Sequence, residues 1–206
     1  MSEFISINKD NPYERHINKA IDIFKNKGIV IYPTDTIYGI GFTYSNKNGI
    51  DRIAKIKQKK VKNTEFSFIF SNISQIEQYT KPLDKWVFKL LKHNLPGPFT
   101  FILPAGSKIL KELEFKRNSI GVRVPNNNII RQIIDRLEEP ILNSSIHDPD
   151  QIVEYTTDPE LIFERYQHLV DMVIDGGSGA IEPSTVVDCT GNEPEIIRQG
   201  AGDLEF

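Results

Sequence analysis

Hydrophobic residues recur along this chain at two spacings, one typical of helices and one typical of strands. In a first segment they fall three or four positions apart, at Ile17, Ala20, Ile21 and Phe24, which predicts a helix with one apolar face. Residues 29–32 then form an unbroken apolar run rich in β-branched side chains, which predicts a short buried strand.

The ends of the predicted helices depend on residues with strong positional preferences. Asn11 is a good N-cap and Pro12 suits the first helical position, so the first helix is expected to begin there. Gly28 is expected to close it, because glycine readily adopts the left-handed conformation that ends many helices. Leu95-Pro-Gly-Pro98 is expected to end a later helix, since neither proline can continue it.

The remaining elements follow in chain order. Further helices are predicted at residues 46–57, 82–92, 128–137 and 159–166, and further strands at residues 66–70, 100–103, 120–124, 140–142, 169–174, 185–188 and 195–198. Strands alternate with helices through most of the chain, which predicts an α/β fold whose helices cover the sheet. The last strands have no helix between them, so a mixed sheet is expected. No linker interrupts residues 1–206, which we expect to form one domain.

Composition narrows the class of protein but not its function. Of 206 residues, 39% are hydrophobic and 26% charged, and the formal net charge is −3, as in ordinary soluble globular proteins. Cys189 is the single cysteine, which excludes an intramolecular disulfide and suits a reducing cytosol. A buried structural thiol is expected there. Neither a signal peptide nor a membrane-spanning apolar run is present, so we expect a cytoplasmic protein with no membrane partner.

A small polar turn follows the predicted strand at residues 29–32. Thr34, Asp35 and Thr36 come after Pro33, which cannot donate to a sheet ladder, and Gly39 and Gly41 lie just beyond, where backbone can pass close to a neighbour. The residues alone leave two interpretations open: a simple connection between two strands, or a turn that binds a ligand.

The densest run of charge lies at the end of the helix predicted at residues 46–57. Residues 52–62 contain no acid and six basic residues: Arg52, Lys55, Lys57, Lys59, Lys60 and Lys62. Such a run is usually a solvated helix end that the helix dipole favours. The other interpretation is a site for an anion, such as a phosphate, a carboxylate or an RNA backbone.

Taken together, these motifs resemble the YrdC-like family of threonylcarbamoyl-AMP synthases. The resemblance covers nearly the whole chain, and the two ends, at Asn11-Pro12 and in residues 198–206, are most similar to the YciO branch. The matching segments are Pro33 to Gly39, Lys55-Ile-Lys57, Pro96 to Thr100, Gly121 to Pro125, Ser145, Pro183 to Asp188, and Arg198-Gln-Gly200. The resemblance implies a twisted, mixed, open α/β sheet with a concave basic cleft.

The family's reaction joins L-threonine, bicarbonate and ATP into threonylcarbamoyl-AMP and pyrophosphate, an intermediate for adenosine modification in tRNA. By resemblance, ATP is a substrate and Mg²⁺ accompanies it, and no protein metal site is implied. The resemblance implies catalytic roles for Lys55, Lys57 and Ser145. It places Thr34, Thr36, Tyr38, Lys57 and His147 around the amino acid, and Lys55, Thr100, Arg123, Ser145, Thr185 and Arg198 around the nucleotide.

Two of these positions depart from the family pattern. Lys57 replaces an arginine, and lysine lacks the planar fork that holds a carboxylate with two parallel hydrogen bonds. His147 replaces an asparagine. The departures keep two further hypotheses open. One is a non-catalytic protein of the same fold that binds double-stranded RNA or tRNA through scattered lysines. The other is a related enzyme that acts on a different carbamoylated or adenylated molecule.

Overall fold

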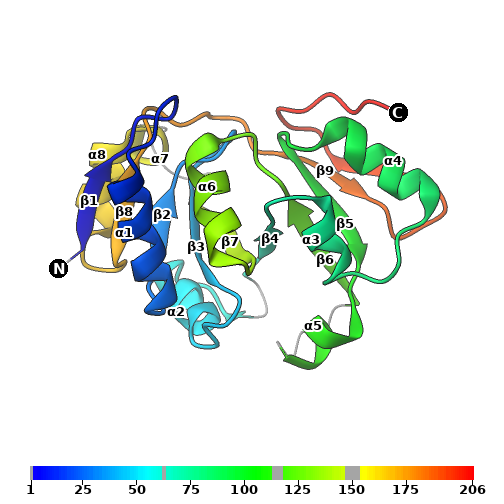
Figure 1. Cartoon of the computed structure of the whole chain (residues 1–206), viewed down its shortest axis with the longest axis horizontal. Helices are drawn as coiled ribbons and strands as arrows, with labels where there is room; N and C mark the ends of the chain where they lie inside the picture. Colours follow the sequence, from blue (N-terminus) through cyan, green and yellow to red (C-terminus); the bar gives the residue numbers. More distant parts are fainter. Residues whose placement is uncertain (1, 62–63, 113–117, 147–153) are drawn as a thin grey trace.

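The computed structural model describes residues 2–61, 64–112, 118–146 and 154–206, and it contains a ten-stranded mixed sheet (Figure 1). In sheet order the strands are β1 (Glu3–Ser6), β8 (Met172–Asp175), β2 (Val30–Tyr32), β3 (Gly39–Thr43), β7 (Ile141–Ser145), β4 (Ser67–Ile69), β6 (Ser119–Arg123), β5 (Phe99–Pro104), β9 (Thr185–Asp188) and β10 (Glu195–Arg198). The helices are α1 (Glu14–Lys25), α2 (Gly49–Ile56), α3 (Ile73–Glu77), α4 (Lys85–Asn94), α5 (Ser107–Glu112), α6 (Asn128–Leu137), α7 (Glu154–Thr157) and α8 (Pro159–Tyr166).

One half of the sheet is buried on both faces. Every residue of β2 and β3 is buried, because the two faces of these strands belong to different apolar clusters. On one face, Val30 and Ile141 pack with Phe24 of α1 and Ile133 of α6. Figure 1 shows α1 and α6 side by side, with α1 toward β1, β8 and β2 and α6 near β3 and β7.

The other half of the sheet has one face open to solvent. Along β5 and β9, buried residues alternate with half-buried ones, as expected when only one side of a strand is covered. The half-buried residues point to the face that carries α1 and α6 elsewhere, and neighbouring ones are in register across β4, β6, β5 and β9. We call this surface the open face, and its residues are Ser67, Thr100, Ile102, Gly121 and Val186.

The predicted α/β class and the mixed sheet are confirmed. Helices at residues 128–137 and 159–166 and strands at 185–188 and 195–198 have the predicted bounds. The short elements β1, α3, α5 and α7 were missed, because so few residues indicate an element only when they form a distinct apolar, β-branched run. Among the described residues, none of the helices combines the length and the apolar character that crossing a bilayer requires.

The predicted start of α1 was wrong. The helix begins at Glu14, and the extended residue Tyr13 is its N-cap. Asn8 explains the difference, because its side-chain oxygen accepts hydrogen bonds from the backbone N–H groups of Asp10 and Asn11 at 2.8 and 3.3 Å. These contacts hold residues 8–11 in a turn of their own, so Asn11 is unable to cap the helix.

The predicted end of α1 was also wrong in detail. The left-handed residue is Lys27, with φ of 63°, and not Gly28. Glycine is required at position 28 for space, because a Cβ there would lie 2.4 Å from Cγ2 of Ile23. The backbone N–H of Gly28 donates to the carbonyl of Ile23 at 2.9 Å, which closes the helix.

The strained residue after α1 gives a stability prediction. We expect Lys27→Gly to raise the free energy of unfolding by about 0.5–1 kcal/mol, because a left-handed lysine costs more than the backbone entropy that glycine adds to the unfolded chain. Lys25→Gly, inside the same helix, is the matched control and should lower it by about 0.5–1 kcal/mol. Urea titration measures both changes, and equal effects of the two substitutions would contradict the argument.

Candidate functional site

The Thr34–Thr36 turn is held in shape by its own hydroxyl groups. Thr34 Oγ1 donates to the carbonyl of Ile37 at 2.8 Å and accepts from the backbone N–H of Thr36 at 3.0 Å. The two threonine hydroxyl oxygens lie 3.1 Å apart, and since the Thr34 proton is already donated, Thr36 is the donor between them. Thr36 is 2% exposed, whereas Thr34 and Asp35 remain partly exposed. Thr34 is therefore the threonine that a ligand can reach.

A buried ion pair ties this turn to β6 and α6. Arg123 Nη2 donates to the Asp35 carboxylate at 3.0 Å and to Thr36 Oγ1 at 2.9 Å, and the two charged side chains are 7% and 9% exposed. The other Asp35 oxygen accepts from the backbone N–H of Asn126 at 2.8 Å. Burial lowers the pKa of Arg123, and Asp35 opposes that shift by stabilising the charged guanidinium. We call these contacts the Asp35–Arg123 latch.

The structure brings Lys57 to the carboxyl end of β7. Lys57 Nζ donates to Ser144 Oγ at 3.0 Å and to the carbonyl of Ser145. Lys57 is the C-cap of α2, and Gln58 then takes the left-handed conformation with φ of 53°. Ser145 in turn is in register with Gly39 of β3, three residues after Thr36. Lys57 and Ser145 therefore lie beside the turn.

Lys55 does not share this position. It is exposed on the last turn of α2, two residues before Lys57, and two residues along a helix rotate a side chain by about 200°. Arg52 is engaged elsewhere, since it forms an ion pair with Asp171 at 2.9 Å. Of the basic run, Lys57 is the residue that the described contacts bring to the turn. Lys62, and the predicted substrate residue His147, lie outside the described residues.

Tyr38 positions a glycine-rich segment over the turn. Its hydroxyl donates to the carbonyl of Gly177 at 2.7 Å and accepts from the N–H of Gly176 at 3.1 Å. Burial raises the pKa of Tyr38 to about 12, so the phenol stays protonated. Glycine is needed at position 177, where φ is +89°, and at Gly179, where a Cβ would lie 2.7 Å from the Tyr38 ring. The segment thus packs closely against the predicted substrate residues.

The predicted nucleotide residues Thr100 and Arg198 meet at Ser184. The hydroxyls of Thr100 and Ser184 lie 2.8 Å apart, and Arg198 Nη2 donates to the Ser184 carbonyl at 2.7 Å. Arg198 lies near enough to Arg123 for its charge to lower the pKa of Arg123. Arg198 therefore adds a positive charge near the buried Asp35–Arg123 pair, which suits an anion.

Thr185 lies beneath this surface and holds the C-terminal segment. It is fully buried, and its hydroxyl accepts from the N–H groups of Gly200 and Gly202, each at 3.0 Å, and donates to the Gly202 carbonyl at 2.7 Å. Its hydroxyl is therefore fully engaged by the chain itself. Cys189 is buried as expected, and burial raises the pKa of its thiol to about 12, so it remains protonated.

Several residues of this region were missed by the sequence analysis. Asp35 was noted only as a turn residue, and the glycine-rich segment 176–179 and the open-face residues Ser67 and Gly121 were not assigned a role. The Gly-Gly-Ser-Gly run after a strand was a usable signal. No signal in the sequence pointed to the pairing of Asp35 with Arg123, because 88 residues separate them in the chain.

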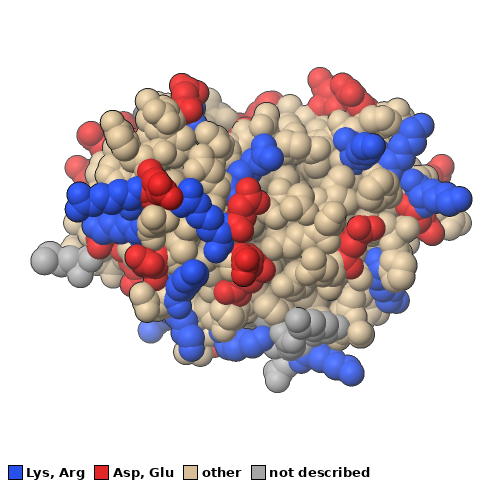
Figure 2. All heavy atoms as spheres, viewed as in Figure 1, with Lys and Arg blue, Asp and Glu red and all other residues tan. Residues whose placement is uncertain are grey.

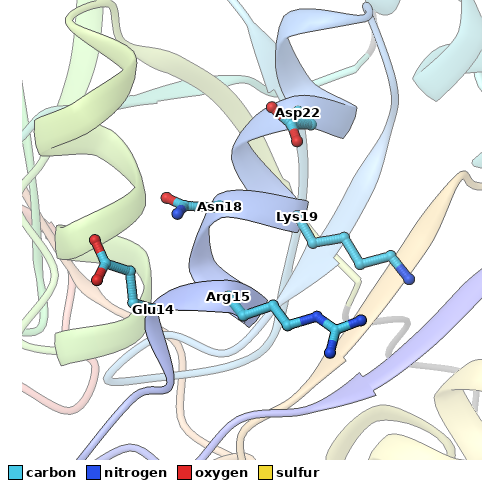
Figure 3. Close-up of a pocket in the computed structure, with 5 residues that line it drawn as sticks. All are labelled: Glu14, Arg15, Asn18, Lys19 and Asp22. Carbon is cyan, nitrogen blue, oxygen red and sulfur yellow. The ribbon is translucent and has the colours of Figure 1, made fainter.

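Other charged surfaces of the molecule are separate from this site. A shallow hollow on the outer side of α1 is lined by Glu14, Arg15, Asn18, Lys19 and Asp22, all from that one helix (Figure 3). On the face of the molecule in Figure 2, acidic and basic side chains are interspersed. Within the part of the chain that the structure describes, no three His, Cys, Asp or Glu side chains are grouped closely enough to hold a metal ion.

Comparisons with known proteins agree with the resemblance. The family model described as "Telomere recombination", which spans Sua5, YciO and YrdC proteins, matches residues 22–200. An uncharacterized protein of Haemophilus influenzae is 40% identical over 98% of this chain and 97% of its own length. YciO of Escherichia coli is 37% identical over 100% of this chain and 98% of its own. Its crystal structure superimposes with a TM-score of 0.89 over 98% of both chains.

Threonylcarbamoyl-AMP synthases are more distant. The enzyme of Pyrococcus abyssi is 28% identical, and 93% of this chain matches 56% of it. The crystal structure of P. abyssi Sua5 complexed with L-threonine has a TM-score of 0.83 at 24% identity, over 97% of this chain and 58% of that one. The latter match shows a shared fold.

The latch gives a prediction for stability. We expect Asp35→Asn to lower the free energy of unfolding by about 3 kcal/mol, because it leaves a buried guanidinium without its counter-charge. Arg123→Met should cost less when Asp35→Asn is already present, since the double variant buries no unpaired charge. Urea unfolding of the four proteins in this cycle gives the coupling energy, expected at about 2 kcal/mol. Additive single effects would show that the pair does not act as a unit.

Proposed function

Because this chain belongs to the family of Sua5, YciO and YrdC proteins, we propose that it is an enzyme of the threonylcarbamoyl-AMP synthase type. The reaction joins L-threonine, bicarbonate and ATP into threonylcarbamoyl-AMP and pyrophosphate, for adenosine modification in tRNA. The proposal is supported by membership of a family that includes threonylcarbamoyl-AMP synthases. The chain is more similar to YciO than to those synthases, so the reaction is the part of the proposal that the assay below tests.

The proposed chemistry consists of two bond-forming steps. The amine of threonine attacks the carbon of bicarbonate or CO₂ and forms a carbamate, with release of water when bicarbonate reacts. A carbamate oxygen then attacks the α-phosphorus of ATP, and the bond to the leaving pyrophosphate breaks. Two anions must meet in line, so positioning and positive charge are what the protein must supply.

The single observation that carries the proposal is the meeting of the predicted residues around one turn. Arg123 hydrogen-bonds the turn itself, Lys57 contacts Ser144 and Ser145, and Ser145 is in register with Gly39, three residues after Thr36. Arg198, near Arg123, adds a second guanidinium beside the open face. In this proposal Lys57 contacts the threonine carboxylate and a phosphate, and Thr34 lies against the amino acid.

The other predicted residues act through their neighbours in this proposal. Arg123, Thr36 and Tyr38 are buried and hydrogen-bonded within the protein, so they shape the turn, and Thr185 holds the segment of Arg198. Mg²⁺ would supply charge neutralisation on the phosphates of ATP. The described residues offer it no carboxylate cluster, so phosphate oxygens and water would be its ligands.

Binding of double-stranded RNA is the competing hypothesis. The exposed lysines Lys55, Lys59 and Lys60 favour it. Against it, Arg52 is paired with Asp171, and the face in Figure 2 carries acids among its basic residues, which lowers attraction for a polyanion. A cationic site in which Arg123 is buried and Lys57 partly buried fits a small anion better than an RNA backbone.

The test is pyrophosphate release from ATP with labelled bicarbonate, with and without threonine. We expect release that depends on threonine, together with label in a product that contains AMP. Release without threonine would assign a different substrate. An absence of release, together with salt-sensitive retention of RNA on a filter, would replace the proposal with RNA binding.

Two neighbouring lysines provide a matched pair for the same assay. We expect Lys57→Ala to lower kcat/KM about 100-fold, because one cationic group at the reacting centre is removed. Lys55→Ala removes the same charge from the exposed side of α2 and should change kcat/KM by less than about threefold. An equal loss in both variants would place the anions on α2 itself and contradict the assignment of Lys57.

A further inference from the structure

A hydrogen-bonded chain of buried polar groups ends at the middle of the open face. Tyr32 Oη lies 2.8 Å from Asn143 Oδ1, and Asn143 Nδ2 lies 3.3 Å from Ser67 Oγ. Tyr32 and Asn143 are 0% and 3% exposed, whereas Ser67 is half-buried. The chain therefore begins in the core and reaches solvent at Ser67.

The direction of this chain is fixed. An amide oxygen only accepts hydrogen bonds, so the Tyr32 hydroxyl must be the donor to Asn143. Burial raises the pKa of Tyr32, which keeps the phenol protonated. The amide nitrogen of Asn143 therefore faces Ser67 and donates to its hydroxyl oxygen. Ser67 accepts here, and its own proton has no acceptor among the residues that the structure describes.

Ser67 lies on the sheet between Ser145 of β7 and Arg123 of β6. It is in register with Asn143 of β7 and Gly121 of β6. Ser145 lies two residues beyond Asn143, and Arg123 lies two residues beyond Gly121, but β7 and β6 run in opposite directions. Strand geometry places these two residues roughly 17 Å apart, with Ser67 near the midpoint. On the ladder of strands, Ser67 is therefore the half-buried hydroxyl residue between these two positions.

Gly121 leaves the strand without a side chain at this point of the open face, and the residue is half-buried. A Cβ at position 121 would lie 3.1 Å from Cγ2 of Thr100 and 3.6 Å from Cβ of Ser67, at the level of the side chains of the open face. Because glycine has no Cβ, the strand backbone is less covered between Thr100 and Ser67. At the Arg123 end, the buried Nε also has no hydrogen-bond partner among the described residues, a further sign that an acceptor belongs near this surface.

We propose that Ser67 and Gly121 hold the central part of the nucleotide, the ribose and α-phosphate, and that the Ser67 hydroxyl donates to an oxygen of that part. The inference rests on the proposed function for its choice of nucleotide. The phosphate chain then extends toward Lys57 and Ser145, and the other end of the nucleotide lies toward Thr100, Ser184 and Arg198. Because the Ser67 oxygen already accepts from Asn143, its hydroxyl is left to donate, which favours ligands that present an acceptor at this point.

Equilibrium binding by calorimetry tests this without turnover and without threonine, using the full chain with ATP, AMP and pyrophosphate as separate probes. We expect Ser67→Ala to weaken ATP and AMP about tenfold and to leave pyrophosphate within about twofold, because pyrophosphate lacks the ribose and α-phosphate oxygens. Ser67→Thr keeps the hydroxyl and should bind all three as the wild type does. Ser45→Ala, which removes a hydroxyl that donates to Glu139 at 2.9 Å, is the control.

Gly121→Ala provides a second, independent test of the proposed nucleotide site. The new methyl group fits beside Thr100 with small shifts, so the protein should fold, while affinity for ATP and AMP should fall at least tenfold. Gly191→Ala is the matched control, because a Cβ at Gly191 meets only the Glu193 carbonyl at 3.9 Å. Thermal unfolding of each variant verifies the fold.

The possible outcomes are distinct. Unchanged affinity for ATP in folded Ser67→Ala and Gly121→Ala, an equal loss for pyrophosphate, or no binding of ATP by the wild type would overturn the inference. Affinity that responds as expected, in a protein that releases no pyrophosphate with threonine, would instead overturn the proposed reaction and leave the nucleotide site standing.

Discussion

The Asp35–Arg123 latch is the contact on which the candidate site depends. A turn of small polar residues has little apolar surface with which to fix its position, and its hydroxyls are used internally. The latch fixes it from outside, because one carboxylate accepts from a guanidinium on β6 and from a backbone N–H in the loop between β6 and α6. A buried ion pair adds little net stability compared with an apolar pair. We infer that its role is to specify where the turn lies.

Incomplete coverage of the sheet explains why a polar surface exists beside this turn. α1 and α6 bury one face of the sheet over β2 and β3, and on that face the strands β5 and β9 keep only half-buried residues. Buried polar groups need partners, so the core polar residues Tyr32 and Asn143 are hydrogen-bonded in a chain that ends at the open face. The same arrangement that satisfies the core also directs a donor toward solvent.

Membership of the family concerns the fold, whereas the contacts of Lys57 concern the chemistry of the site. Similarity along the full length to YciO, together with more distant similarity to threonylcarbamoyl-AMP synthases, establishes the family and the fold. It does not fix the chemistry, because Lys57 stands where the resemblance implies arginine. The amine of Lys57 contacts Ser144 and the Ser145 carbonyl, so it keeps a cation next to the turn but offers a point charge and not a planar fork.

The sequence by itself determined the α/β class, the mixed sheet and the bounds of the amphipathic helix α6, because a helix buried on one face repeats its apolar residues every three to four positions. It also marked the polar turn and Lys57. Only the tertiary structure decided which polar groups meet. The order of β7, β4, β6 and β5 in the sheet places Ser67 beside Gly121 and brings Arg123 within reach of Asp35. Local periodicity carries no record of strand order, since each strand would show the same pattern beside any other neighbour.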